Sequence, residues 1–358
     1  MSGLTQLLLA TGGTGGHIYP ALAVAREARK RGIEVAVMGG SGGMEERLAQ
    51  EEGLAFFGVS TGKWDRQRPD PRQALAAAKG LVDARRLARS FDPQLVIGFG
   101  GFASLPGCAA ARSLSIPLVL HEGNAFPSRV NRWFASSARL FVSAQEEALR
   151  HVKARATLVV PFPVREERLA RAAARDLLGL PHDAIVTLVM GGSQGSLALN
   201  RAVPDAYERL APPKELGAQH VVLHSTGPRW FEEVAARVSG PNYQPRPYLD
   251  ATAAWSAADL AITRAGVGTL SEAAFHGVPS IMVPLPTSAD DHQRHNARAV
   301  EAAGAGVMVE ERDVARLPAA WTAALDPAWR TAAAAAAVRR TPAGAARRIV
   351  DAVLELVN

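Results

Sequence analysis

The sequence predicts an α/β protein made of two doubly wound domains, each with a parallel sheet at its centre. Short apolar runs rich in β-forming residues alternate with longer stretches of helical periodicity, which is typical of parallel α/β architecture. The length of 358 residues exceeds that of one typical domain. In addition, the order apolar run, glycine-rich loop, helical stretch occurs at residues 6–31 and again at residues 184–203.

The first domain is expected to hold a sheet of short, apolar strands. Glycines follow two helical stretches at Gly32 and Gly53, where helices commonly end. The expected strands are residues 6–10, 34–38, 55–59, 94–98, 118–121, 140–143 and 158–160, and the expected helices include residues 18–31, 71–90 and 104–113.

A segment with two prolines, VVPFPVREER, separates the predicted domains near residues 160–168, after which the scheme restarts with AIVTLVMGGSQGSLALNRAV. We expect a first domain of residues 1–162 and a second of residues 163–341. The last helix, residues 342–358, is expected to pack back on the first domain. Because ligands bind at the carboxyl ends of the strands in such sheets, the two sets of loops should face a central cleft. Further strands are expected at residues 220–224, 260–263 and 280–284.

Composition and charge narrow the class of protein. The chain is 48% hydrophobic and 21% charged, as is usual for a globular protein with a large core. The single cysteine, Cys108, excludes an internal disulfide, and no run approaches the roughly 20 apolar residues of a membrane span. The net charge of +6 comes mainly from arginine, which suits phosphate ligands, although a compositional bias toward Arg and Ala explains it equally well. We expect a soluble, intracellular protein that binds no nucleic acid, because no motif for it is present.

The opening loop, TGGTGGH, has the composition of a phosphate-binding turn between a strand and a helix. It does not fit the dinucleotide fingerprint, because Ile18 stands where the third glycine is required and the second strand ends without a carboxylate for a ribose. The backbone N–H groups of Thr14, Gly15 and Gly16 would still form an anion site for a diphosphate. His17 follows in the same turn, either as a structural capping residue or as a catalytic base.

Two further segments bring polar groups to the ends of strands in the first domain. In GFGGFASLPG, the glycines suggest the close approach of a ligand or a tight structural turn, and Ser104 is placed to cap the next helix. In LVLHEGNAF, Glu122 ends a strand. Its carboxylate would take a proton or orient a histidine, or it would be satisfied within a buried hydrogen-bond network.

The second domain repeats the pattern of phosphate-binding loops. GGSQGS places Ser193 where its hydroxyl can donate to a diphosphate. In TRAGVGTLSE, Thr269 lies at a helix start that favours a leaving diphosphate, and Glu272 can accept two ribose hydroxyls. Alternatively, Thr269 and Glu272, three residues apart, have the spacing of a capping box, in which both would only stabilise the helix start. His292 and His295 lack a convergent third ligand, so we expect no metal.

Taken together, these motifs resemble the MurG family of glycosyltransferases of peptidoglycan synthesis. The matching stretches are GGTGGHIYPALAVA, GFGGFASLPG, HEGN followed by Asn131, PVR at 163–165, GGSQGS, HSTG at 224–227, GTLSE and DHQRHNA, in the family's order and spacing over essentially the whole chain. The resemblance implies a GT-B fold and transfer of N-acetylglucosamine (GlcNAc) from UDP-GlcNAc to lipid I, the undecaprenyl-diphosphate-linked MurNAc-pentapeptide, which gives lipid II. It also implies inversion at the anomeric carbon, with no metal and no cofactor.

The resemblance further assigns roles to residues at the matching positions. His17 is the candidate base, with Glu122 and Asn131 supporting the acceptor, and an acceptor loop contains Gly100, Gly101 and Ser104. The implied donor-binding residues are Thr14, Gly15, Gly16, Asn124, Arg165, Ser193, Leu249, Val267, Gly268, Thr269, Leu270, Ser271, Glu272 and Gln293. The glycine loops of the first domain, with Thr14, Gly15 and Gly16 among them, are expected to bind the acceptor diphosphate as well. The chain departs from the family pattern at Gly123, at Pro161 and Phe162, and at Val267 and Gly268.

A lipid-linked acceptor requires contact with a bilayer. Residues 64–91 combine seven Arg and Lys residues with leucines and a valine, which is typical of an interfacial amphipathic helix, and residues 128–139 add to this set. In the alternative interpretation the apolar residues of this helix face the core. We expect an anionic membrane surface as a partner, and peripheral attachment to the cytoplasmic face of the cell membrane.

Other functions make different demands on the sequence. A glycosyltransferase with another acceptor, such as a diacylglycerol or a natural-product aglycone, would share most of these motifs. A UDP-GlcNAc 2-epimerase would need carboxylates around C2 of the sugar, and no convincing set is present. A nicotinamide-dependent oxidoreductase would need the missing third glycine and ribose carboxylate. A non-catalytic nucleotide-binding module would have no need of His17 and HEGN.

Overall fold

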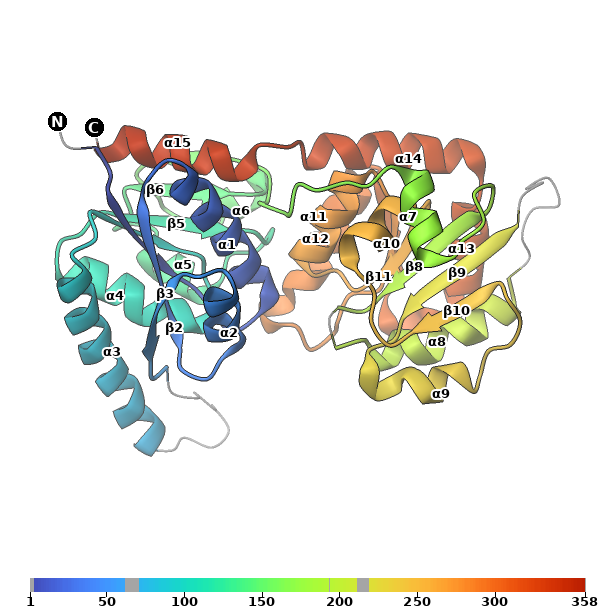
Figure 1. Ribbon diagram of the computed structural model, residues 1–358, viewed down its shortest axis with the longest axis horizontal. Coiled ribbons are helices and arrows are strands. Elements are labelled where there is room, and N and C mark those ends of the chain that lie inside the picture. Colours follow the sequence, from blue (N-terminus) through green and yellow to red (C-terminus); the bar gives the residue numbers. More distant parts are fainter. Residues whose placement is uncertain (1–2, 62–70, 193, 211–218, 358) are drawn as a thin grey trace. The chain divides into compact units, whose positions relative to one another are not determined.

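The computed structural model describes residues 3–61, 71–192, 194–210 and 219–357, and the chain forms two compact units (Figure 1). Unit 1 comprises Met1–Val164 together with Gly344–Asn358, and unit 2 comprises Arg165–Ala343. Each unit has one parallel sheet with helices packed on both faces. The predicted fold class, α/β with two doubly wound sheets, is confirmed.

The sheet of unit 1 has seven parallel strands in the order β3-β2-β1-β4-β5-β6-β7. Its central strand β1 is apolar on both faces because helices cover both, and Leu7, Leu8 and Leu9 are fully buried. The chain winds outward from β1 through β2 to β3 and then resumes on the other side of β1 with β4. The strands are β1 Gln6–Ala10, β2 Glu34–Gly40, β3 Ala55–Val59, β4 Leu95–Gly98, β5 Leu118–Glu122, β6 Leu140–Ser143 and β7 Thr157–Val159.

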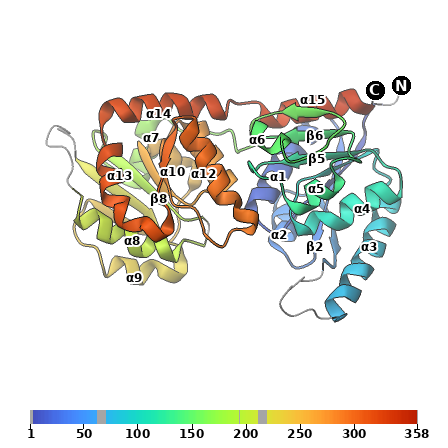
Figure 2. The same ribbon diagram turned by 180° about the vertical axis from the view of Figure 1, so that it is seen from behind.

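Two groups of helices cover the sheet of unit 1, and they can be followed from behind in Figure 2. Helices α1, α2 and α15 share one core, and α3, α4 and α5 share the other. The C-terminal helix α15 buries Ile349, Val350 and Val353 in the same core as α1, and Arg348 donates a hydrogen bond to the carbonyl of Val159 (3.2 Å). The helices are α1 Gly15–Lys30, α2 Met44–Glu51, α3 Pro71–Phe91, α4 Leu105–Ser113, α5 Arg129–Phe134, α6 Glu146–Leu149 and α15 Ala345–Val357.

The sheet of unit 2 repeats this winding with six parallel strands in the order β10-β9-β8-β11-β12-β13. Two edge strands, β10 and β13, were not among the predicted strands, because β10 is polar and contains Pro245 and β13 is only three residues long. Strand β12 ends at Met282, earlier than predicted. The strands are β8 Ile185–Met190, β9 His220–Ser225, β10 Tyr243–Arg246, β11 Leu260–Thr263, β12 Ser280–Met282 and β13 Gly306–Met308.

Helices also cover both faces of the second sheet. The aromatic side chains Trp321 and Trp255 are each almost fully buried, one on each side of the sheet. The helices are α7 Arg171–Leu178, α8 Leu197–Glu208, α9 Phe231–Ala235, α10 Ala251–Ala257, α11 Val267–His276, α12 His292–Ala302, α13 Leu317–Ala324 and α14 Pro327–Arg340.

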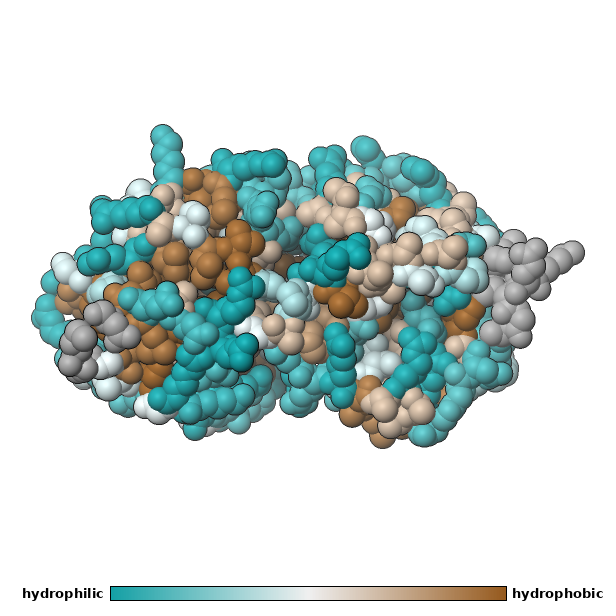
Figure 3. Space-filling view, turned by 90° about the horizontal axis from the view of Figure 1, so that it is seen from above, coloured by the Kyte–Doolittle hydropathy of each residue, from teal (hydrophilic) through white to brown (hydrophobic). Residues whose placement is uncertain are grey.

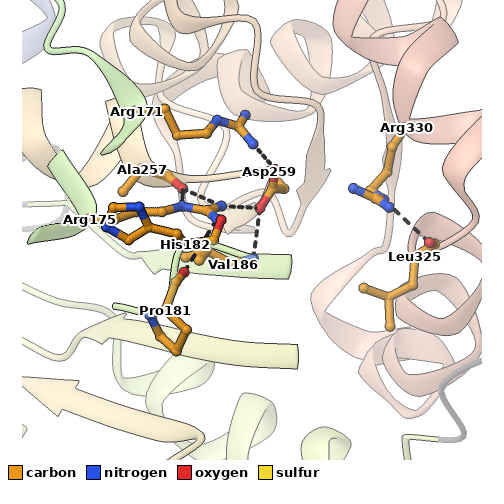
Figure 4. Close-up of polar contacts among 9 residues, drawn as sticks. All are labelled: Arg171, Arg175, Pro181, His182, Val186, Ala257, Asp259, Leu325 and Arg330. Atoms are coloured by element: carbon orange, nitrogen blue, oxygen red, sulfur yellow. Dashed lines mark hydrogen bonds and ion pairs between the residues drawn. The ribbon is translucent and has the colours of Figure 1, made fainter. Parts of the chain in front are cut away.

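A buried ion pair joins elements at the amino ends of two central strands of unit 2 (Figure 4). Arg175 of α7 is 2% exposed and lies 2.7 Å from the carboxylate of Asp259, which directly precedes β11. The same carboxylate oxygen accepts a hydrogen bond from the N–H of Val186 in β8 (2.8 Å). Arg175 also donates to the carbonyl of Ala257 (3.2 Å). The pair therefore fixes α7 and β11 against β8 at the edge away from the glycine-rich loops.

Candidate functional site

In each unit, the glycine-rich loops lie where the winding of the sheet reverses. In unit 1 one loop follows β1 and the other follows β4, and these two strands are neighbours in the sheet. In unit 2 the corresponding loops follow β8 and β11, which are also neighbours. Such a reversal point is the usual place for a ligand in an open parallel sheet, because the loops diverge there at the carboxyl ends of the strands.

The opening loop begins α1 without a side-chain cap. Gly12 (φ 146°) and Gly13 (φ 87°) adopt backbone conformations that favour glycine, and Thr14 is the N-cap residue but its side chain does not cap the helix. The hydroxyl of Thr11 donates to the carbonyl of His17 (2.7 Å), which folds the loop onto the first helical turn. The start of α1 therefore offers uncapped N–H groups, as a binding site for an anion requires.

His17 has a defined orientation and tautomer. Its Nδ1 lies 2.9 Å from the carbonyl oxygen of Phe99, which follows β4. A carbonyl oxygen can only accept, so Nδ1 carries the proton and Nε2 carries the lone pair when the ring is neutral. The geometry fits a proton acceptor at Nε2.

Glu122 forms the centre of a buried network at the end of β5. It is 1% exposed, and one carboxylate oxygen accepts hydrogen bonds from the N–H and the side-chain amide of Asn124 (2.9 and 3.0 Å). The other oxygen accepts from the N–H of Ser128 (2.8 Å) and the side-chain amide of Asn131 (2.9 Å). Of the alternatives left open by the sequence, the structure supports the satisfied network, in which Glu122 orients two asparagines.

The glycines after β4 bring this network close to His17. A Cβ atom at Gly100 would lie 3.0 Å from Oγ of Ser128, 3.1 Å from Nδ2 of Asn131 and 3.5 Å from Cε1 of His17. A Cβ atom at Gly101 would lie 2.8 Å from Cδ2 of His17. Both glycines have positive φ, so internal packing and backbone conformation explain them without a ligand.

The predicted capping role of Ser104 is wrong. Ser104 is fully buried, and its hydroxyl donates to the carbonyl of Gly101 (2.9 Å) instead of capping α4. Ser104 therefore stabilises the turn after β4, and its buried side chain cannot contact a ligand at the surface of this turn.

A second histidine, His121, joins the network only through its backbone carbonyl, which accepts from the side-chain amide of Asn131 (2.9 Å). It is 1% exposed and packs between Phe99 and Phe162 (ring centroids 5.2 and 5.8 Å away). Burial, with a smaller effect from nearby His17, lowers the pKa of His121 to about 3. The ring is therefore neutral near pH 7 and serves packing.

In unit 2, the glycine loop after β8 packs against the loop after β9. A Cβ atom at Gly195 would lie 1.9 Å from the carbonyl oxygen of Thr226, so only glycine allows this approach. Asn200 donates to the same carbonyl (2.9 Å), and its oxygen lies 3.0 Å from Nε2 of His224. Burial lowers the pKa of His224 to about 3. Ser193, the predicted diphosphate donor in this loop, lies outside the described residues.

Arg264, which follows β11, ties three loops together. Its guanidinium donates to Oγ of Ser196 (2.9 Å) and to the carbonyl of Val283 (3.0 Å), and it lies 2.6 Å from the carboxylate of Glu311. Ser196 in turn caps α8 by accepting from the N–H of Leu199 (3.4 Å). Arg264 thus holds the start of α8 next to the loop before α11.

Helix α11 begins two residues before Thr269. Its N-cap is Gly266, which has no side chain to cap it, so Thr269 lies inside the first turn and the capping-box alternative is wrong. Glu272 accepts a hydrogen bond from the indole N–H of Trp255 (3.2 Å), and burial raises the pKa of its carboxyl group. The backbone N–H groups at the start of α11 and one oxygen of Glu272 remain suited to polar ligand groups.

Gln293 and Asn296 of α12 both contact Ala265, which lies two residues before the start of α11. The side-chain oxygen of Gln293 accepts from the N–H groups of Ala265 (3.2 Å) and Leu285 (3.0 Å), and the amide of Asn296 donates to the carbonyl of Ala265 (3.2 Å). The two hydrogen bonds of Gln293 use only its side-chain oxygen, so its amide nitrogen is the atom suited to donate to a ligand. Both side chains therefore position the loop before α11.

Two family models match the chain: the glycosyltransferase family 28 N-terminal domain over residues 7–141 and the glycosyltransferase family 28 C-terminal domain over residues 186–349. A relative from Deinococcus deserti is 48% identical and covers 98% of each chain, and one from Thermus thermophilus is 41% identical and covers 97% of this chain and 98% of its own. Both are named UDP-N-acetylglucosamine--N-acetylmuramyl-(pentapeptide) pyrophosphoryl-undecaprenol N-acetylglucosamine transferase. The crystal structure of Acinetobacter baumannii MurG is 28% identical, covers 98% of this chain and 99% of its own, and has a TM-score of 0.79. The chain belongs to the MurG family.

The fold is shared more widely than the MurG family. The spinosyn forosaminyltransferase SpnP covers 99% of this chain with a TM-score of 0.71, but it is only 16% identical. Likeness at this level concerns the fold alone, because one fold carries many acceptor specificities.

Two residues that the MurG resemblance assigns to the donor are placed differently from a typical side-chain ligand. Arg165 is exposed and pairs with Glu167 (2.7 Å). Leu249 is 7% exposed and belongs to the core of unit 2, so only its backbone could meet a ligand. Within the described part of the chain, no group of three His, Cys, Asp or Glu side chains is placed to hold a metal ion.

Two charged residues beside the glycine-rich loops, one in each unit, were not among the predicted site residues. Arg264 and Glu45 are both almost buried and both contact glycine-rich loops. No sequence signal distinguished them, because their roles depend on which loops the fold brings together.

The predicted membrane helix is described only from residue 71 onward, so residues 64–70 lie outside the described residues. Along α3, Ala84 and Ala88 face the core, whereas Leu75 and Val82 are 73% and 69% exposed on a face that also carries Lys79. The interpretation that all apolar residues face the core is therefore wrong for Leu75 and Val82. Hydrophobic residues also gather over unit 1 on the face shown in Figure 3. No described helix is long and apolar enough to cross a bilayer.

Proposed function

We propose that this chain transfers GlcNAc from UDP-GlcNAc to lipid I and so forms lipid II. The observation that carries this proposal is the 48% identity over 98% of the chain to a transferase whose name states this donor and this acceptor. The residues of both glycine-loop regions support the proposal, since they supply a candidate base in unit 1 and helix N-termini for a diphosphate in unit 2.

Unit 2 is proposed to bind the donor. The N–H groups at the start of α11, from Val267 to Thr269, would contact the diphosphate, and Glu272 would accept the ribose hydroxyls. The amide nitrogen of Gln293 would contact the sugar, and the backbone of Leu249 would contact the uracil. The remaining proposed donor contacts are Ser193, Leu270, Ser271 and Arg165 in unit 2, together with Asn124 of unit 1.

Unit 1 is proposed to bind the acceptor and to supply the base. The N–H groups of Thr14, Gly15 and Gly16 would bind the diphosphate of lipid I, while Nε2 of His17 takes the proton from the C4 hydroxyl. The oxygen of that hydroxyl then bonds to the anomeric carbon of GlcNAc. The bond from this carbon to the β-phosphate breaks, and UDP leaves with the electron pair. Attack from the opposite face inverts the anomeric carbon.

The leaving UDP needs stabilisation of its negative charge. The positive end of the α11 dipole and the uncapped N–H groups there supply it. Arg264 supports this arrangement indirectly. It lies in the loop before α11, and its hydrogen bond to Ser196 fixes the loop after β8 beside that loop.

Attachment to the cytoplasmic face of the cell membrane is proposed to involve α3. Its exposed apolar residues Leu75 and Val82 lie among basic residues, as in helices that bind the surface of anionic bilayers. On α5, Trp133 is 58% exposed and directly follows Arg132, with Arg129 about one turn earlier, and it would add an aromatic anchor.

An assay of UDP release tests donor and acceptor together. UDP-GlcNAc and UDP-glucose are each combined with lipid I and with diacylglycerol. We expect rapid release only for UDP-GlcNAc with lipid I. Release with diacylglycerol and none with lipid I would assign the chain to a different acceptor.

A further inference from the structure

Glu45 is a buried carboxylate beside the opening glycine loop, and it takes no part in the transfer step proposed for His17. It is the second residue of α2 and is 3% exposed. A buried carboxylate is costly unless hydrogen-bond donors surround it, so its contacts show what it stabilises.

The contacts of Glu45 join two loops. One carboxylate oxygen accepts a hydrogen bond from the N–H of Gly40, at the end of β2 (3.0 Å). The other accepts from the N–H of Gly13, in the opening loop (3.4 Å). The start of α2 also favours a negative charge at this position. Glu45 therefore connects the opening loop to the end of the neighbouring strand.

Glycines make the space that this carboxylate occupies. A Cβ atom at Gly12 would lie 2.2 Å from Oε1 of Glu45, and one at Gly43 would lie 2.5 Å from Oε2. A Cβ atom at Gly39 would lie 2.8 Å from Cγ of Glu45. The first glycine of the TGGTGGH motif is thus explained by Glu45 and not by a ligand.

The opposite side of the loop is held by the turn after β4. A Cβ atom at Gly101 would lie 2.9 Å from the carbonyl oxygen of Gly12 and 2.8 Å from the ring of His17. The opening loop is therefore held between Glu45 on one side and the Gly100–Gly101 turn on the other. Removal of the carboxylate would release one of the two sides.

We propose that Glu45 is a positioning residue for the acceptor. It holds residues 11–17 so that the N–H groups of Thr14, Gly15 and Gly16 and the ring of His17 keep the orientation in which they meet a diphosphate-linked acceptor. The N–H of Gly13 is bound by Glu45, so the acceptor diphosphate is met by the start of α1 and not by Gly13. This inference rests on the proposed function, because it assumes that the opening loop binds the acceptor.

The test compares Glu45→Gln with the matched control Glu46→Gln. Glu46 lies in the same helical turn and also accepts a backbone N–H, that of Gly42 (2.6 Å), but does not contact the opening loop. Glutamine at position 45 keeps the shape of the side chain but presents an amide donor to one of the two N–H groups.

Initial rates are measured with lipid I and UDP-GlcNAc varied separately. We expect kcat/KM for lipid I to fall roughly tenfold in Glu45→Gln, as for the loss of one charge-assisted hydrogen bond, with KM for UDP-GlcNAc within about twofold of wild type. Glu46→Gln should match wild type in both.

Hydrogen exchange provides a readout that needs no substrate. Peptides that cover residues 11–17 should exchange faster in Glu45→Gln than in wild type or Glu46→Gln, while peptides from unit 2 stay unchanged. If Glu45→Gln does not fold, Glu45→Asp is measured in the same way, because its shorter side chain cannot reach both N–H groups. Unchanged acceptor kinetics, an equal change in donor KM, or unchanged exchange at residues 11–17 in the folded variant would overturn the proposal. Wild type that shows no transfer to lipid I would instead overturn the proposed function, and the exchange data would then decide the role of Glu45 alone.

Discussion

The orientation of His17 is the residue-scale feature with the most direct chemical consequence. The carbonyl of Phe99 holds its Nδ1 proton, so the ring presents Nε2 as the acceptor. Glu122, by contrast, uses both oxygens on four donors from its own network. We therefore propose His17 for proton transfer, whereas Glu122 orients Asn124 and Asn131.

His17→Ala should lower kcat for lipid I by about 10²-fold or more, since a positioned general base contributes on that scale. UDP binding to unit 2 should not change. The control is His182→Ala, because His182 is an exposed histidine of unit 2 that contacts Asp176. Initial-rate kinetics at saturating donor check the effect. A kcat close to wild type would remove His17 from the role of base.

Individual side-chain contacts were the least predictable part of the site. The sequence pattern predicted the glycine loops, His17 and Glu122, because strand–loop–helix patterns are local. It did not predict that Glu45 fills the space beside Gly12, or that Ser104 binds Gly101 instead of capping α4. The contact of Glu45 with the opening loop joins residues 32 positions apart, which no local pattern records. Ser104 and Gly101 are only three residues apart, but a serine at a helix start can cap the helix or bind a nearby carbonyl, and the sequence does not decide between the two.

At the scale of elements, the buried pair of Arg175 and Asp259 connects α7, β8 and β11 (Figure 4). Arg175→Ala leaves the Asp259 carboxylate without its buried partner, and we expect it to lower the free energy of unfolding of unit 2 by about 3–5 kcal/mol. Arg171→Ala is the matched control, because Arg171 binds the same carboxylate but is 55% exposed. Its loss should cost about 1 kcal/mol or less. Urea denaturation measures both, and equal effects would contradict this account of the pair.

The exposed face of α3 gives a second prediction at this scale. The double variant Leu75→Asp, Val82→Asp should reduce co-sedimentation with anionic vesicles at least about fivefold, because it removes apolar area and adds negative charge. Leu177→Asp is the control, since Leu177 of α7 is 68% exposed but lies in unit 2. Binding of wild type should also weaken as salt increases. Vesicle binding that is equal in the double variant and wild type would exclude α3 as the membrane-binding face.

The elements themselves were predicted well wherever their apolar pattern was strong. All seven strands of unit 1 lie at or within two residues of the predicted boundaries. In unit 2 the edge strands β10 and β13 were missed, because an edge strand need not be apolar and β13 has only three residues. Thr269 lies in the first turn of α11, at the helix start as predicted, and the helix begins at Val267 after the glycine N-cap Gly266.

At the scale of the whole molecule, buried neutral histidines make stability depend on pH. His121 in unit 1 and His224 in unit 2 have a pKa of about 3 when folded, lowered mainly by burial, and an ordinary pKa near 6.5 when unfolded. Between these values the unfolded chain binds more protons than the folded chain. The contribution of these two neutral histidines to the free energy of unfolding is therefore complete above pH 6.5 and is lost as the pH falls toward 3.

His224→Gln should reduce the fall in stability of unit 2 on acidification. Each such histidine contributes a slope of about 1.4 kcal/mol per pH unit well below pH 6.5, and the variant lacks one of them. Urea denaturation at pH 7.5, 6.5 and 5.5 measures the slope for wild type, His224→Gln and the exposed control His182→Gln. The same slope in all three would contradict burial as the origin of the shift.

The central claim at this scale is that the two units together carry out one reaction, the transfer of GlcNAc to lipid I. The most direct measurement is the mass of the product after incubation of the purified chain with UDP-GlcNAc and lipid I, alongside a reaction with diacylglycerol. We expect lipid I to gain one GlcNAc residue as UDP is released, and diacylglycerol to gain none. A glycosylated diacylglycerol with unmodified lipid I would contradict the assignment of lipid I as the acceptor.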